Sequence, residues 1–135
     1  MRVMQFLVCV DGEQFRTSEP SRTVLRGVGY YISAPSGLAF PILIPRLRVF
    51  TRFYDFIGGN QFQIKVYWHS PDGLKLLRRR VRKPIEFSGF NRVEDYLFPI
   101  QNIHLQGPGL HEIRLTSVQL PKIILARDFL EVTQQ

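Results

Sequence analysis

With 135 residues, 44% of them hydrophobic and 21% charged, the chain has the size and composition of one globular domain, which excludes wholesale disorder. The formal net charge is +7. Five of the cations lie between Arg78 and Lys83, and without them the net charge is +2, so the basicity is local. The single cysteine, Cys9, excludes an intrachain disulfide and a cysteine-based zinc site.

The first half of the chain alternates apolar runs with Pro- and Gly-rich joints, which predicts short strands. A strand is expected near Val3–Val10, then a polar loop over Glu13–Ser21. A second strand follows over Thr23–Ser33, where Gly27 and Gly29 suggest a bulge or a bend.

Prolines shape the next segment, because each removes a donor from a sheet ladder. Ala34–Pro45 contains three of them, which predicts an extended crossover between sheets rather than a central strand. Arg46–Tyr54 is then a strand and Asp55–Asn60 a turn. The period of two puts the apolar residues Leu47, Val49 and Phe53 on one face and the cations Arg46, Arg48 and Arg52 on the other.

The clearest signal is a hairpin. Phe62–Trp68 alternates strictly between apolar and polar residues, as a half-buried strand does, and Ser70–Gly73 has the chemistry of a type I turn. A four-residue loop places His69 opposite Leu74, with Arg78, Arg80 and Arg82 outward on the returning strand. A three-residue loop with a bulge shifts that register by one, and the sequence leaves both possibilities open.

The chain after Lys83 again alternates short strands with turns. Turns are expected over Pro84–Arg92 and Gln106–Gly109, one strand or two over Val93–Leu105, and strands over Leu110–Leu115 and Lys122–Val132. Helix signals are meagre, with Val93–Phe98 as the best candidate for a single turn. The prediction is one all-β domain over residues 1–135, an antiparallel two-sheet β-sandwich of immunoglobulin-like or C2-like type with about seven to nine strands.

Four segments in this order resemble a group of small bacterial proteins. They are Phe40-Pro41 with Pro45, the Phe62–Trp68 strand with its Pro-Asp-Gly turn, Pro108–Leu115, and Phe129–Val132. The chain is similar over residues 1–133 to small bacterial single-domain β-sandwich proteins of a domain family of unknown function. It departs from their pattern at His111, where an aromatic residue is usual. The resemblance implies the fold and a bacterial origin, and it supplies no active site.

The returning strand of the hairpin carries the five cations of Arg78–Lys83, and we call it the basic strand. Its cations have two interpretations. Lys and Arg on an edge strand block edge-to-edge aggregation, and their stems cover apolar surface, so edge protection is the first. Binding of nucleic acid or another polyanion is the alternative. Its candidate residues are Arg78, Arg79, Arg80, Arg82 and Lys83, with Arg46, Arg48 and Arg52 as a possible extension and Tyr67 or His69 as stacking surfaces. An acidic protein or an anionic membrane surface is a further partner for the same cations.

No motif predicts catalysis or a cofactor. His69, His104 and His111 lack the spacing of metal ligands, so no metal site is expected. The adjacent carboxylates Glu94 and Asp95 point apart on a strand, and there is no nucleophile elbow. A hydrolase with dispersed residues remains an alternative, and it requires His104 or His111 to meet a carboxylate in a concave pocket.

These observations predict a non-enzymatic interaction or assembly module with a protein partner or a second copy of itself. Tyr30–Tyr31, Phe50, Phe53–Phe56 and Phe87–Phe90 supply aromatics either for a binding face or for the core. The start of the chain lacks a signal-peptide pattern and no stretch is long enough to span a bilayer, so a soluble cytoplasmic protein without membrane insertion is expected.

Overall fold

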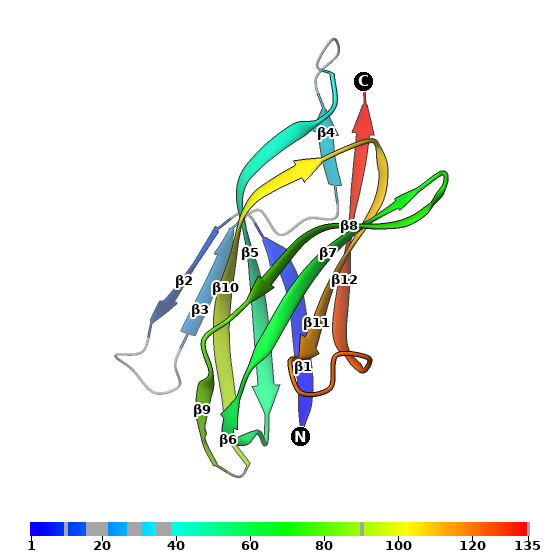
Figure 1. The fold of residues 1–135 in the computed structure, drawn as a ribbon. Helices are drawn as coiled ribbons and strands as arrows, with labels where there is room; N and C mark the ends of the chain where they lie inside the picture. The colour runs from blue at the N-terminus through cyan, green and yellow to red at the C-terminus, as the bar shows by residue number, and fades with distance from the viewer. Residues whose placement is uncertain (10, 16–21, 27–30, 35–38, 90, 135) are drawn as a thin grey trace.

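Two β-sheets packed face to face make up the body of the protein (Figure 1). The computed structural model describes residues 1–9, 11–15, 22–26, 31–34, 39–89 and 91–134, which form twelve β-strands and no helix. Within these ranges, no helix is long and apolar enough to cross a membrane. The strands are β1 (Arg2–Cys9), β2 (Asp11–Phe15), β3 (Arg22–Arg26), β4 (Tyr31–Ala34), β5 (Ile42–Tyr54), β6 (Ile57–Asn60), β7 (Phe62–Ser70), β8 (Gly73–Val81), β9 (Ile85–Ser88), β10 (Val93–Leu105), β11 (Gly109–Ser117) and β12 (Ile124–Gln134).

The strand order confirms the predicted β-sandwich. One sheet has the order β1-β5-β10 and the other the order β4-β12-β11-β7-β8, and two short pairs, β2-β3 and β6-β9, accompany them. The two main sheets hold eight strands, within the predicted range, and the short pairs add four. Pairing is antiparallel throughout except between β4 and β12.

Alternate residues of both sheets fill one core. Phe62, Ile64 and Val66 of β7 are at most 3% exposed, as the alternation predicts, and they pack in one cluster with inward residues of β5, β10 and β11. Phe53 lies at the centre of an aromatic group, with its ring 4.9 to 5.1 Å from those of Phe56, Phe62 and Phe87. The core interpretation therefore holds for Phe53, Phe56 and Phe87, and Phe50 is also buried. Tyr30 and Phe90 lie outside the described residues.

Some expected loops are strands. Asp11–Phe15 pairs with β3 although it was expected to enter a loop, and β6 and β9 pair with each other where turns were expected. The expected strand over Thr23–Ser33 is present as β3 and β4, with Gly27 and Gly29 outside the described residues. β2 is short and polar and β6 is short and glycine-rich, so backbone pairing stabilises them without the alternating pattern from which strands are recognised; β9 alternates but has only four residues.

The proline-rich crossover was placed too far along the chain. β5 begins at Ile42 and contains Pro45, while residues 35–38 lie outside the described part. The pairing of β5 with β1 begins only at Arg48, so Pro45 has just β10 beside it, and the register there omits both Pro45 and Asn102. Asn102 has a φ of 57°, which marks a local irregularity opposite the proline. Pro45 is therefore accommodated where the strand is still an edge. β10 is one strand of 13 residues, and no helical turn forms at Val93–Phe98.

Candidate functional site

Strand β8 is the edge of the five-stranded sheet, where the basic strand was expected to lie. His69 is opposite Leu74, as the four-residue loop predicts, but a bulge between Val66 and Tyr67 of β7 changes the register further along. Beyond it Arg78 is opposite Val66 and Arg80 is opposite Ile64. The sequence left two registers open, and the structure combines them: the loop has four residues, but one extra residue in β8, Leu77, shifts the strand by one. Arg78, Arg80 and Arg82 therefore lie on the inward face, and the outward orientation expected for the unshifted register is wrong.

Arg78 and Arg82 lie against β10, the edge strand of the other sheet. Arg78 Nε donates to the main-chain oxygen of Gln101 at 3.0 Å, and the Arg82 guanidinium lies 5.7 Å from the ring centre of Phe98. Burial, and then the neighbouring charge of Arg80, lowers the pKa of Arg82 below its ordinary value. Their stems cover the side of the sandwich between β8 and β10, while Arg79 and Lys83 are exposed.

The other three predicted cations, which lie on β5, belong to the three-stranded sheet. Arg46, Arg48 and Arg52 alternate with the buried Leu47, Val49 and Thr51, so they belong to the outer face of β1-β5-β10. The predicted set of eight cations therefore does not form one continuous face. Arg46 is linked to the basic strand through Gln101, which is its register partner on β10 and accepts a hydrogen bond from Arg78.

Arg52 is already paired with a carboxylate of the same sheet, that of Asp95. Its Nε and Nη2 donate to the two carboxylate oxygens of Asp95 at 2.8 and 3.0 Å, a bidentate pair. The hydrogen bond to Asp95 raises the pKa of Arg52, against a smaller opposing effect of burial. Its guanidinium also lies 5.5 Å from the ring centre of Phe50. Arg52 is thus a structural residue of this sheet.

A second group of cations, absent from the predicted set except for Arg79, lies on the outer face of the five-stranded sheet. Register places Arg127 of β12 opposite Arg114 of β11, Arg114 opposite Lys65 of β7, and Lys65 opposite Arg79 of β8. We call these four residues the cross-strand basic row. Each belongs to a different strand, so only the strand order brings them together.

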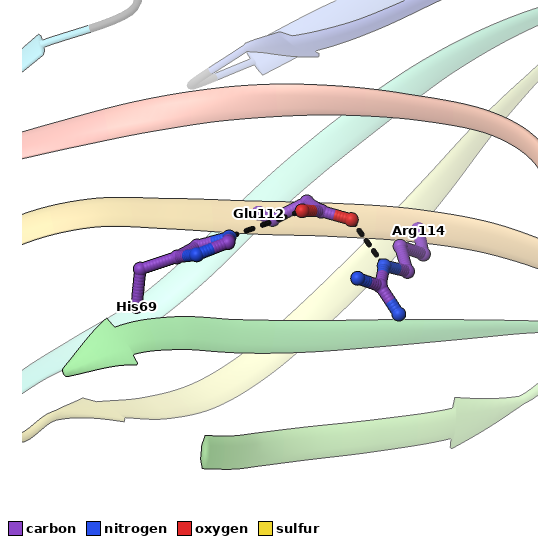
Figure 2. A network of polar contacts seen from close by, with 3 residues as sticks. All are labelled: His69, Glu112 and Arg114. Atoms are coloured by element: carbon purple, nitrogen blue, oxygen red, sulfur yellow. Dashed lines mark hydrogen bonds and ion pairs between the residues drawn. The ribbon is translucent and has the colours of Figure 1, made fainter. Parts of the chain in front are cut away.

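Beside this row lies a buried carboxylate (Figure 2). Glu112 of β11 has a side chain only 3% exposed; it accepts from Arg114 Nε and lies 3.1 Å from His69 Nε2. Burial alone raises the pKa of Glu112, but the hydrogen bonds from Arg114 and His69 outweigh it and the pKa is lowered. The same contact with Glu112 raises the pKa of Arg114, whose guanidinium lies 4.5 Å from the ring centre of Tyr67.

The other histidines do not meet a carboxylate in the contacts described. His111 is fully buried; its Nδ1 donates to the Gly109 carbonyl at 3.1 Å, and its ring stacks on Trp68. Burial lowers the pKa of His111, so the ring is neutral near pH 7. His104 is exposed. Among the described residues, no group of three His, Cys, Asp or Glu side chains is placed to hold a metal ion.

The sheets and their shared core define the class of protein, a two-sheet β-sandwich. No protein-family model matches the chain. No curated protein matches it either. Among solved structures, it is similar to a β-glucosidase from Listeria innocua in complex with isofagomine, with a TM-score of 0.44, 10% identity and 96% of this chain covered, but it spans only 16% of that enzyme chain. It is also similar to an immunoglobulin-like protein from Pseudomonas aeruginosa, with a TM-score of 0.39, 12% identity, and 93% and 95% of the two chains covered.

Proposed function

We propose that the protein is a non-enzymatic interaction module that self-associates through the end of the β7–β8 hairpin. The hairpin end projects from the body of the sandwich (Figure 1). Leu74 and Leu76 near this end are 44% and 51% exposed. The observation that carries the proposal is this exposed apolar end on an edge strand, since such strands pair readily with another strand.

The bulge at Leu77 divides β8 into two unlike halves. On one side of it, Arg78 and the following Arg82 lie against β10 and occupy that flank of the sandwich. On the other side, Gly73–Leu76 carries one cation, Lys75, and two exposed leucines that lie opposite His69 and Tyr67. Only the apolar half is therefore left without the charged protection that edge strands usually have.

A second copy of the chain is the occupant that fits this edge. Antiparallel pairing of the two Gly73–Leu76 segments about a two-fold axis satisfies the free main-chain groups of both. It also brings the leucines of one copy beside those of the other on the outer face of the joined sheets.

Two further observations support a non-catalytic role and the proposed cytoplasmic location. The carboxylate that contacts a histidine, Glu112, is held by Arg114 and is 3% exposed, which suits a structural network better than a reacting group. Cys9 is the single cysteine of the sequence and is buried, so the chain holds no intrachain disulfide, which fits a compartment in which thiols remain reduced.

Sedimentation velocity over a concentration range tests the proposal. The wild-type chain is expected to pass from monomer to dimer, and the L74K/L76K double variant to remain monomeric with an unchanged circular dichroism spectrum. The control is Leu120→Lys, because Leu120 is 58% exposed but lies outside the strands, so dimerisation should persist. A wild-type chain that stays monomeric up to high concentration contradicts self-association.

A further inference from the structure

The cross-strand basic row is an unfavourable arrangement for stability alone. Like charges directly opposite each other on neighbouring strands destabilise a sheet, and the row contains three such pairs in succession. Among the described residues, the carboxylate paired with the row is Glu112, which contacts Arg114. The row therefore keeps a local excess of positive charge.

Edge protection does not account for the row. Arg114 and Lys65 belong to β11 and β7, which have a paired strand on both sides, so charges there do not guard a free edge. Lys65 lies between two arginines in register, and no ion pair is found for it in the described part of the chain.

Three of the four cations are held in place by neighbours on the same face. Arg114 lies over the Tyr67 ring and Arg127 lies 5.8 Å from the ring centre of Phe129. Arg79 Nε donates to Gln63 Oε1 at 2.9 Å. Cations that are already ordered lose less conformational entropy when an anion binds, which favours a binding role.

We propose that the cross-strand basic row binds the phosphodiester backbone of single-stranded nucleic acid. Neighbouring strands are about 4.8 Å apart, so four in-register cations form a line of about 14 Å, which suits a chain of linked phosphates better than one small anion. Tyr67 and Phe129 lie next to the row with guanidinium groups over their rings, and such aromatic and guanidinium planes stack on unpaired bases. The overall charge of +7 adds long-range attraction.

The row and the exposed leucines lie on the same outer face, with Leu76 opposite Tyr67, but the row uses β12, β11, β7 and the part of β8 beyond the bulge, so it does not need the proposed self-association. Fluorescence anisotropy with labelled oligo(dT)20 is the test. Four cations offset by one carboxylate correspond to about three neutralised phosphates, which predicts a slope of log K against log salt of about −2. Lys65→Gln should weaken binding severalfold at low salt and reduce the slope by about 0.7.

Matched variants separate the row from general basicity and from misfolding. Arg46→Gln removes the same charge from the outer face of the other sheet and should leave the slope unchanged. Lys65→Gln should also raise the stability of the sheet slightly, because it removes two like-charge oppositions. If Lys65→Gln and Arg127→Gln bind oligo(dT)20 as the wild type does, the row is not the site.

Binding to other polyanions tests whether the row prefers single-stranded nucleic acid. Oligo(dT)20 should bind more tightly than a 20-base-pair duplex of equal concentration, since the bases of the duplex are not free to stack. Binding to heparin or to phosphatidylserine vesicles without binding to oligo(dT)20 would overturn the assignment to nucleic acid. Loss of oligo(dT)20 binding in L74K/L76K, which keeps the row and adds two cations to the same face, would overturn the assignment of binding to the row.

Discussion

Arg78 and Gln101 join the edges of the two sheets, through a hydrogen bond of 3.0 Å from Arg78 Nε to the Gln101 carbonyl oxygen. β8 and β10 are edge strands of different sheets, so this contact lies across the sandwich rather than within a sheet. A cation that the alternating pattern places in solvent thus becomes part of the structure. The bulge that turns Arg78 inward lies beyond the tip of the hairpin, where Leu74 and Leu76 keep the register set by the four-residue loop and stay exposed.

Replacing Glu112 with Gln should destabilise the fold. The variant removes the charge that Arg114 and His69 share, on a side chain 3% exposed, and we expect a loss of about 2 kcal/mol in the free energy of unfolding. Urea denaturation measures it at pH 7. Glu131→Gln is the control, because Glu131 is exposed on β12, and a loss equal to that of Glu112→Gln would contradict the structural role of the network.

Stability should fall as the pH drops below the ordinary histidine pKa of 6.5. The folded state holds the pKa of His111 below that value, so in this range the unfolded chain binds a proton that the folded chain does not, and acid favours unfolding. Unfolding free energies at pH 7.5 and 5.5 should differ in the wild type and in His104→Gln. The difference should shrink in His111→Phe; an unchanged difference would assign the acid sensitivity to other groups.

Gly107→Ala should loosen the packing around Trp68. A β-carbon at residue 107 would lie 2.4 Å from Trp68 Cζ2, and the indole is held by its hydrogen bond to the Pro108 carbonyl and by stacking on His111. Overpacking of this kind costs about 1–3 kcal/mol. Because Trp68 is the single tryptophan, its emission should shift on substitution.

Gly59→Ala is the matched control for that substitution. The atom nearest to its added β-carbon is the carboxylate oxygen of the exposed Glu86, which can move away, so a small effect is expected. Equal losses of stability at Gly107 and Gly59 would show that the close approach to Trp68 is unimportant.

Arg52→Lys tests the bidentate pair without changing the net charge. A lysine cannot make both hydrogen bonds to Asp95, whose side chain is 8% exposed, so we expect a loss of about 1 kcal/mol in the free energy of unfolding. Arg46→Lys, at an exposed position, should have almost no effect. A neutral Arg52→Lys in thermal denaturation would mean that the second hydrogen bond contributes nothing.

Much of the fold follows from local pattern. The alternation in Phe62–Trp68 correctly predicted both the strand and its buried face, since a half-buried sheet imposes a period of two. Strands such as Ile57–Asn60 and Asp11–Phe15 were missed because tertiary pairing, rather than composition, stabilises them. The bulge at Leu77 has no local signature, and it alone reverses the faces of three arginines.

For the candidate sites too, local sequence predicts only part of what the structure brings together. Clustering along the sequence drew attention to Arg78–Lys83, but the cross-strand basic row takes one residue from each of four strands separated by up to 62 positions. Nothing in Lys65 or Arg127 taken singly marks it as part of a site. Only the order β12-β11-β7-β8 and its register place these residues in one line.

Hydrogen exchange at two protein concentrations tests the proposed self-association through the hairpin end most directly. At a concentration where sedimentation shows dimers, amides of Gly73–Leu76 that do not bond to β7 should exchange more slowly than in the dilute monomer. Amides of Arg78–Arg80 should change little, because that half of β8 already lies beside β10. Dimers that form without added protection in Gly73–Leu76 would contradict self-association through the hairpin end.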